Sequence, residues 1–202
     1  MQSIRVYGLS TEEYVSQRAW ESASLDVCPY HLDGGCQLLR HGTYGRAEPP
    51  DCRIARLLCS LTRKTISLLP DCLAAGAKGA LQAIEDVVDA VERRAGSLEQ
   101  HAAGMRPMAE DDPDTDHVVG TVKWLRRRQR WVVVALVVAQ QLLPERLAGC
   151  KPTLAAFRAA LGVAQVLVTL RQLLAARLDE VPTPVGFARP GACPHGMGPD
   201  PP

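Results

Sequence analysis

The sequence has few aromatic residues and almost no net charge. Aromatic side chains make up 4% of its 202 residues, and the formal net charge at pH 7 is +1. A chain so close to neutrality has no overall attraction for nucleic acid, so a nucleic-acid partner must be bound by a local patch. Hydrophobic residues make up 47% of the chain. They are mainly alanine, leucine and valine, which fill the space between helices without large rings.

Long hydrophobic runs are also lacking. The longest, from Trp131 to Ala139, is followed by two glutamines, whereas a helix that spans a bilayer needs about 20 apolar residues. This run is therefore interpreted as a buried helix, with no membrane contact. The first residues, MQSIRVYGLSTEEY, contain no apolar stretch of the kind that directs secretion. We therefore expect a cytoplasmic protein, in which clustered cysteines bind metal more often than they form disulfides.

Cysteine occurs seven times, and with histidine it is concentrated in CPYHLDGGCQLLRHGTYGR, residues 28–46. Cys28 and His31 are separated by two residues, a gap that lets both side chains point at one ion. Cys36 follows a Gly-Gly turn, and Cys59 lies at the end of a later β-type segment. Structural zinc takes four Cys or His ligands in a tetrahedron. We therefore expect Cys28, His31, Cys36 and Cys59 to hold one zinc ion.

The fourth ligand is the weakest part of this pattern. Thr62 occupies the position three residues after Cys59, where a second ligand pair would be completed, and threonine is not a zinc ligand. Cys52 or His41 is an alternative to Cys36. A further alternative is that no metal binds and that the cysteines serve as small core residues.

Four stretches of the region 28–71 resemble a known module. CPYH, LLRHGTYGR, RIARLLC and TISLLPD are similar to the N-terminal zinc ribbon of bacterial insertion-sequence transposases and of their stand-alone relatives. The resemblance covers about a fifth of the chain. It implies a metal knuckle at Cys28 and His31, a second ligand position at Cys59, and a small β meander. The β-type runs at 37–44, 53–59 and 65–69 fit such a meander.

From Leu73 onward the pattern is typical of helices. Leu81, Ile84 and Val88 recur at three- and four-residue steps, which gives one apolar face. On the same stretch Glu85, Asp86 and Asp89 are expected to be solvated. Further helices are expected at 97–106, 117–143 and 153–178. The apolar core of the last two is expected to comprise Val134, Val137, Val138, Leu142, Leu154, Phe157, Leu161, Leu167, Leu170 and Leu174.

These elements predict a mostly α protein. A small N-terminal zinc-ribbon-like β meander is expected to precede a helical bundle that contains a helix-turn-helix-like unit. The expected parts are an N-terminal segment at 1–72 with the zinc-ribbon-like module at 28–71, a helix-turn-helix-like unit at 73–130, C-terminal hydrophobic helices at 131–180, and a Pro/Gly-rich disordered tail at 181–202.

A basic stretch supplies the candidate nucleic-acid contact. AGSLEQHA, at 95–102, and TVKWLRRRQR, at 121–130, resemble the second and third helices of transposase-type helix-turn-helix domains. Val122, Trp124 and Leu125 are expected to anchor the second of these stretches, whose outer face can enter a major groove. The expected DNA-binding residues are Thr121, Lys123, Arg126, Arg127 and Arg130. The alternative is a solvated basic face whose arginine stems cover apolar neighbours. The acidic stretch at 110–116 weakens the DNA interpretation, because it repels phosphate.

No complete catalytic motif is present, so we expect no enzyme activity. There is no GxSxG and no phosphate-binding loop, and no alternating strands follow the helices to build a nuclease sheet. The first hypothesis is a non-catalytic, transposon-derived protein that binds duplex DNA, with C-terminal helices that pair with each other, with a second copy or with a partner chain. The alternative is a helical protein-interaction or structural protein with a degenerate zinc knuckle and no nucleic-acid binding.

Overall fold

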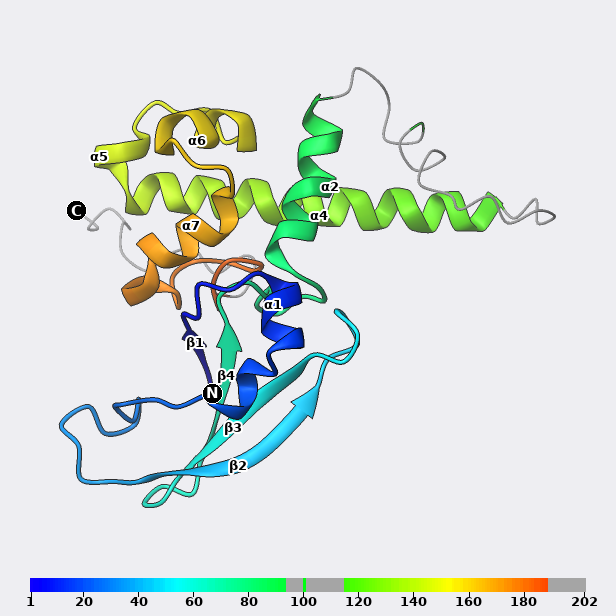
Figure 1. Ribbon diagram of the computed structural model, residues 1–202. Coiled ribbons are helices and arrows are strands. Elements are labelled where there is room, and N and C mark those ends of the chain that lie inside the picture. Colours follow the sequence, from blue (N-terminus) through cyan, green and yellow to red (C-terminus); the bar gives the residue numbers. More distant parts are fainter. Residues whose placement is uncertain (94–99, 101–114, 189–202) are drawn as a thin grey trace, which may run out of the picture.

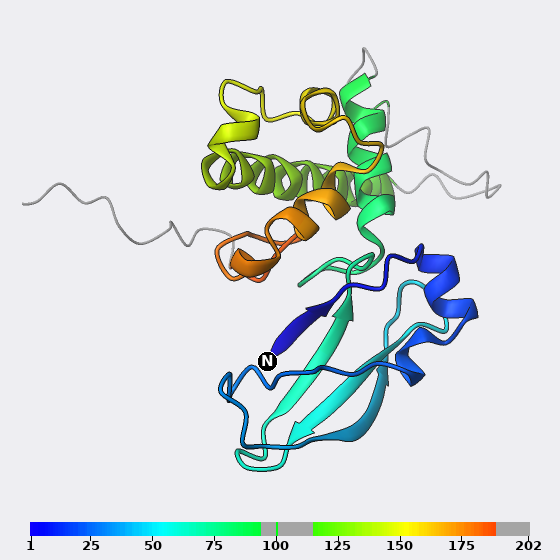
Figure 2. The same ribbon diagram turned by 60° about the vertical axis from the view of Figure 1, so that its left-hand side comes forward.

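The computed structural model describes residues 1–93, 100 and 115–188. A four-stranded sheet is formed within residues 1–70, and six α-helices occur in the described part of the chain. The helices that follow the sheet lie together on one side of the molecule and the sheet lies on the other, in both orientations (Figure 1, Figure 2). The chain is thus divided into a sheet part and a helical part that meet near residue 71.

The sheet has the strand order β1-β4-β3-β2. Its strands are β1 (Gln2–Arg5), β2 (Leu38–Gly45), β3 (Arg53–Cys59) and β4 (Thr65–Pro70). β1 runs parallel to β4, and the other two pairs are antiparallel. The central strands β3 and β4 carry the buried side chains, among them Ile54 and Ile66. β2 is an edge strand with a register shift between Arg40 and Thr43, the kind of bulge that is common at sheet edges.

The expectation of a mostly helical fold with a zinc-ribbon-like meander is wrong. Three strands lie where they were expected, as β2, β3 and β4, but β1 joins them and makes the sheet mixed. In the parallel pair, Gln2 lies opposite Ser67 and Arg5 lies opposite Pro70. A four-residue strand has too little periodicity to reveal its partner, and parallel partners are separated by a long crossover. The local pattern therefore could not show that the N-terminus completes the sheet.

Three of the aromatic residues gather beside the sheet, at α1 (Thr11–Ser16) and the segments around it. α1 begins with a capping box, in which Ser10 and Glu13 exchange side-chain-to-backbone hydrogen bonds. It is followed by the short 3-10 helix η1 (Ala19–Glu21). Tyr14 of α1 is fully buried, and its hydroxyl donates to the Arg53 carbonyl at 3.0 Å. Its ring lies 5.1 Å from that of Tyr7 and 5.7 Å from that of Trp20, so three aromatic side chains fix α1 to the sheet.

The helical part is formed by five helices and a final short turn. These are α2 (Leu81–Arg93), α4 (Thr115–Leu142), α5 (Pro144–Leu147), α6 (Leu154–Leu161), α7 (Val166–Leu173) and the 3-10 helix η2 (Ala175–Arg177). The single helix expected at 153–178 is thus divided. Gly162 ends α6 in the left-handed conformation, with φ of 66°, which glycine adopts at low cost. The helix expected at 97–106, which opens the helix-turn-helix-like unit, falls outside the described residues except for Gln100.

The buried face of α4 differs from the expected one. Val132, Ala135, Leu136 and Ala139 are fully buried, and they contact the core formed with the other helices. Val137, expected in that core, is 37% exposed. The whole stretch from residue 131 to 139 is apolar, so its periodicity cannot show which side faces inward. The core residues expected on α6 and α7 are buried, except for Leu161, which is only partly buried.

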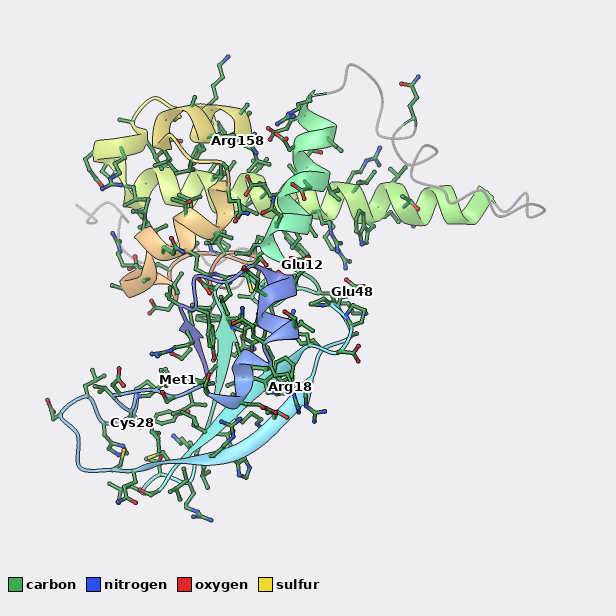
Figure 3. The ribbon with its side chains drawn as sticks, in the orientation of Figure 1. Met1, Glu12, Arg18, Cys28, Glu48 and Arg158 are labelled. Atoms are coloured by element: carbon green, nitrogen blue, oxygen red, sulfur yellow. The ribbon has the colours of Figure 1, made fainter. Side chains whose placement is uncertain are left out.

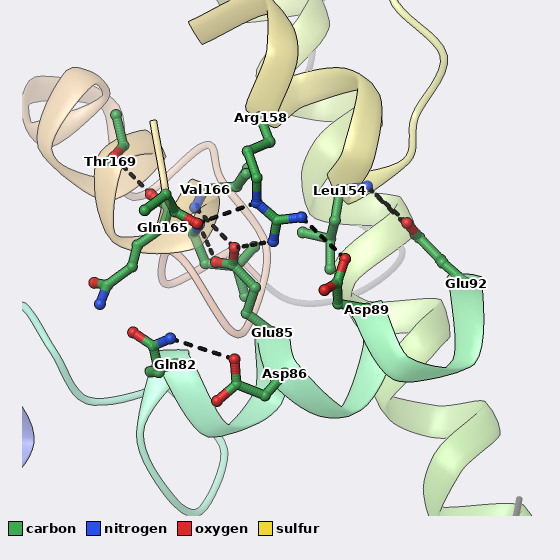
Figure 4. A network of polar contacts seen from close by, with 12 residues as sticks. Gln82, Glu85, Asp86, Asp89, Glu92, Leu154, Arg158, Gln165, Val166 and Thr169 are labelled. Carbon is green, nitrogen blue, oxygen red and sulfur yellow. Dashed lines mark hydrogen bonds and ion pairs between the residues drawn. The ribbon is translucent and has the colours of Figure 1, made fainter. Parts of the chain in front are cut away.

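Two carboxylates of α2 cap two other helices. Glu85 accepts hydrogen bonds from the backbone N–H groups of Val166 and Leu167, at 3.0 and 2.9 Å, where α7 begins. Glu92 accepts from the Leu154 N–H at 3.0 Å, where α6 begins. Arg158 of α6 donates to Glu85 and to Asp89, each at 3.0 Å (Figure 4). Glu85 and Asp89 are therefore buried network residues, although solvation was expected.

The segment 181–188, expected to begin a disordered tail, is described and buried. Val181 and Val185 belong to the helical core. The guanidinium of Arg171, which is 1% exposed, donates to the carbonyls of Val185, Pro184 and Asp71 at 2.7, 2.6 and 3.0 Å, and also to that of Leu73. Burial lowers the pKa of Arg171 to about 9, against the opposing effect of the Asp71 carboxylate. This one cation joins α7, the end of the sheet and the C-terminal segment.

Among the described residues, no single helix is long and apolar enough to cross a membrane. Taken together, α6 and α7 have the length and apolar composition of a membrane-spanning helix, but the two helices are bent by 59° at their junction. Phe157 and Leu167, like the other buried apolar side chains of this pair, lie in the helical core.

Candidate metal centre and cationic helix

The four expected metal ligands meet at one end of the sheet. Cys28 and His31 lie in a tight turn, closed by a hydrogen bond from the His31 N–H to the Cys28 carbonyl at 2.9 Å. Gly34 and Gly35, both with positive φ, then reverse the chain and bring Cys36 back. The end of β3 supplies Cys59. Figure 3 places Cys28 on the sheet side of the molecule, far from Arg158 in the helical part.

A pair of hydrogen bonds aligns Cys36 with Cys59. The neighbours of these cysteines, Gln37 and Ser60, bind each other twice. The Ser60 N–H donates to the Gln37 carbonyl at 2.9 Å, and the Gln37 N–H donates to the Ser60 hydroxyl at 3.0 Å. The ladder between β2 and β3 is thereby extended by one step, so that the two thiols lie next to each other.

The four ligand atoms lie close enough together to surround one metal ion. One atom each of Cys28, His31, Cys36 and Cys59 lies within 4.8 Å of all the others. The Cys59 Sγ and the His31 Nδ1 are 3.5 Å apart. Zinc-to-sulfur and zinc-to-nitrogen bonds of about 2.3 and 2.0–2.1 Å at a tetrahedral angle place sulfur and nitrogen about 3.5 Å apart. This Cys₃His group can therefore hold a metal ion. Cys52 and His41, the alternative ligands, are not members of the group.

The thiols have opposite acidities. Burial opposes ionisation of Cys59, but hydrogen bonds from Thr62 and from the Leu61 backbone outweigh it and lower the pKa of this thiol to about 6. Burial and the neighbouring Cys28 and Cys59 raise the pKa of Cys36 to about 12. Three adjacent thiols cannot all carry a negative charge without a counterion. A bound divalent cation would supply that charge.

Thr62 has a role that the sequence did not reveal. It occupies the place where a fourth ligand was sought, and its backbone N–H lies 3.5 Å from the Cys59 Sγ. Donors of this kind orient a ligand and stabilise its thiolate form. The fourth member of the Cys₃His group is instead Cys36, which lies just before β2 and not in the turn after β3. Thr62 therefore supports the Cys59 thiolate through hydrogen bonding, and its presence at this position does not indicate that a metal ligand has been lost.

The second candidate site is the outer face of α4. Lys123, Arg126, Arg127 and Arg130 are exposed, and their spacing of three, four and seven residues places them on one side of the helix. From residue 117 to the end of α4 there are five cations and no acidic residue. Thr121 is not part of this face. It is partly buried and lies about 200° from Lys123 around the helix axis.

Two tryptophans border this face. Trp124, expected as an anchor, is 39% exposed, and the Arg128 guanidinium stacks 3.6 Å from the centre of its ring. The guanidinium of Arg127 lies 6.0 Å from the ring of Trp131. Cation–π pairs of this kind hold arginines in place while their edges remain able to donate. The anchors of α4 are Val122 and Leu125, as expected, and they contact Val87 and Val91 of α2.

No protein-family model, curated protein or solved structure matches this chain. The interpretation of the two sites therefore depends on their own geometry and chemistry.

Proposed function

We infer that this protein binds duplex DNA, without catalysing a reaction on it, through the outer face of α4. The observation that carries this proposal is the exposed row of Lys123, Arg126, Arg127 and Arg130, on a helix that has no acidic residue after position 116. The row spans about 10 Å along the helix axis, and a B-DNA major groove about 12 Å wide admits an α-helix. Phosphate contacts by such cations release counterions and provide most of the affinity for DNA.

The metal we propose for the Cys₃His group is zinc, in a structural role. Thiolate and imidazole ligands favour zinc over the harder ions magnesium and calcium. Four protein ligands leave no open position for water or substrate, as in structural rather than catalytic sites. The ion would join the turn at 28–36 to the end of β3 and so stabilise the exposed edge of the sheet. It would not take part in the contact with DNA.

The resemblance of the region 28–71 to insertion-sequence transposases supports a transposon origin. It lies in the residues that align with the module's ligand positions, above all Cys28 and Cys59, and not in the topology of the sheet. On this proposal the chain keeps a metal-stabilised module and a cationic helix.

The test is binding of a labelled duplex followed by fluorescence anisotropy. Wild type is compared with Arg126→Ala/Arg127→Ala and with the charge-matched control Arg146→Ala/Lys151→Ala, whose two exposed cations lie outside α4. We expect the α4 variant to bind at least about tenfold more weakly at moderate salt, because two phosphate contacts are lost, and the control to bind like wild type. Equal weakening by both variants would contradict the proposal. So would binding to anionic lipid vesicles in the absence of any binding to the duplex.

One observation favours the alternative of a protein-interaction role. Beyond the cations, the same side of α4 continues with partly exposed Val134 and Val138 and with the more exposed Val137. Such a face can pair with the same face of a second copy. Sedimentation at increasing concentration tests this. A dimer that Val137→Lys abolishes, together with no DNA binding, would favour the interaction role over the DNA-binding one.

A further inference from the structure

A cavity of about 430 Å³ lies between α4 and the C-terminal segment. α4 provides one wall, with Arg126, Arg127, Arg130, Trp131 and Val134, and Pro182 and Thr183 form the other. Pockets for small ligands occupy about 300–1,000 Å³, so the space suits a small molecule or a single unit of a polymer. None of the described residues that line it is acidic.

The wall opposite α4 is held firmly. The buried guanidinium of Arg171 donates to the carbonyls of Pro184 and Val185, directly after Thr183. The Ala75 N–H donates to the Pro184 carbonyl at 2.9 Å. Gly76 approaches Thr183 so closely that a Cβ atom there would lie 2.8 Å from the threonine hydroxyl. The cavity is thus formed by a helix and by a segment that a buried cation fixes in place.

Its chemistry combines positive charge with a flat apolar surface. Three guanidinium groups line the cavity, and arginine remains charged at every physiological pH. A phosphate monoester suits them better than a carboxylate, because it carries about −1.5 to −2 charges and three acceptor oxygens and matches the planar fork of arginine. The indole of Trp131 and the methyl groups of Val134 add a surface on which an aromatic base can stack.

We propose that this cavity binds one phosphorylated nucleoside, with its phosphate against Arg127 and Arg130 and its base against Trp131. The choice of a nucleotide deepens the proposed function and rests on it. The nucleotide is either a free mononucleotide or the phosphorylated end of a strand, since both present the same phosphate and base. Each part of the ligand alone makes only one of the two sets of contacts. Inorganic phosphate does not stack on the indole of Trp131, and an unphosphorylated nucleoside has no phosphate for the arginines to bind.

The test is calorimetric titration of the full chain with adenosine 5′-monophosphate, adenosine and inorganic phosphate. We expect the nucleotide to bind at least about tenfold more tightly than either of the other two, because it makes both sets of contacts. Trp131→Leu should weaken nucleotide binding about 5- to 150-fold, the range of base stacking on an aromatic ring, and leave phosphate binding unchanged. Arg130→Gln should weaken nucleotide and phosphate binding together. The control Arg146→Gln should bind all three ligands like wild type.

A short oligonucleotide with and without a 5′-phosphate distinguishes the two sources. Tighter binding of the phosphorylated oligonucleotide than of the mononucleotide assigns the cavity to a strand end, and equal binding assigns it to a free nucleotide. Both results support the proposal. No binding of the mononucleotide at millimolar concentration, or equal binding by wild type and a folded Trp131→Leu, would overturn it. If the duplex still binds with its dependence on Arg126 and Arg127, only this inference fails, and the proposed function stands.

Discussion

Replacement of Glu85 by alanine should destabilise the protein far more than replacement of its neighbour Asp86. The Glu85 side chain is 2% exposed. It accepts hydrogen bonds from two buried N–H groups of α7 and from Arg158. Each buried donor left without a partner costs about 1–3 kcal/mol. Arg158 retains Asp89, so its charge is not left unpaired. We therefore expect Glu85→Ala to lower the free energy of unfolding by about 3–5 kcal/mol.

The adjacent acid provides the matched control. Asp86 lies on the same helix, is exposed, and accepts one hydrogen bond, from Gln82 at 3.3 Å. Asp86→Ala should change the free energy of unfolding by less than about 0.5 kcal/mol, as is usual for surface substitutions. Urea denaturation followed by far-UV circular dichroism measures both variants. If Glu85→Ala lies within about 0.5 kcal/mol of Asp86→Ala, the capping of α7 by α2 is not the stabilising contact that the geometry indicates.

Three further predictions concern Gly186, Glu92 and the Cys₃His group. Gly186→Ala should lower the thermal midpoint, because a Cβ there would lie 2.3 Å from the carbonyl oxygens of Leu178 and Val181; an unchanged midpoint would show that the segment shifts without cost. Burial raises the pKa of Glu92, so its contribution to stability is greatest at low pH and is lost as the pH rises through the folded-state pKa. Glu92→Gln should therefore be as stable as wild type or more stable at pH 7 and lose that advantage below about pH 4, the ordinary range of a glutamate; a stability loss at pH 7 would contradict this. Protein purified without chelator should contain one zinc ion per chain, and Cys28→Ser should lose it and expose the amides of residues 28–36 to hydrogen exchange while the helical dichroism persists; a folded wild type that contains no metal would exclude the site.

The metal group could be predicted because most of its information is local. Cys28 and His31 lie in one turn, and two glycines return Cys36 to it, so spacing alone brings three ligands together. Cys59 comes from a distant strand, and its position at the end of a β-type segment marked it as part of a second half-site, which the resemblance to a known module supported. The contribution of Thr62 could not be predicted, because its side chain and its backbone N–H reach the Cys59 thiol only through the folded turn that follows β3.

The fold was harder to predict where a contact is distant or a pattern is uniform. β1 pairs with residues more than sixty positions away, and four residues do not encode that choice. On α4 an unbroken apolar run hides the inward face, so Val134, Val137 and Val138 were placed in the core in error. Glu85 and Asp89 are acidic residues on a helix, and such residues are usually exposed to solvent. Their burial follows from α6 and α7, whose helix ends present N–H groups and a guanidinium to α2.

The salt dependence of duplex binding tests the central claim most directly. If four cations of α4 contact phosphates, the logarithm of the affinity should fall with the logarithm of the salt concentration with a slope of about −3.6, which is about −0.9 per contact. Arg126→Ala/Arg127→Ala should bring that slope to about −1.8, because two contacts are removed. A slope that is the same for wild type and this variant would contradict the account, since it would show that the outer face of α4 does not contact the DNA.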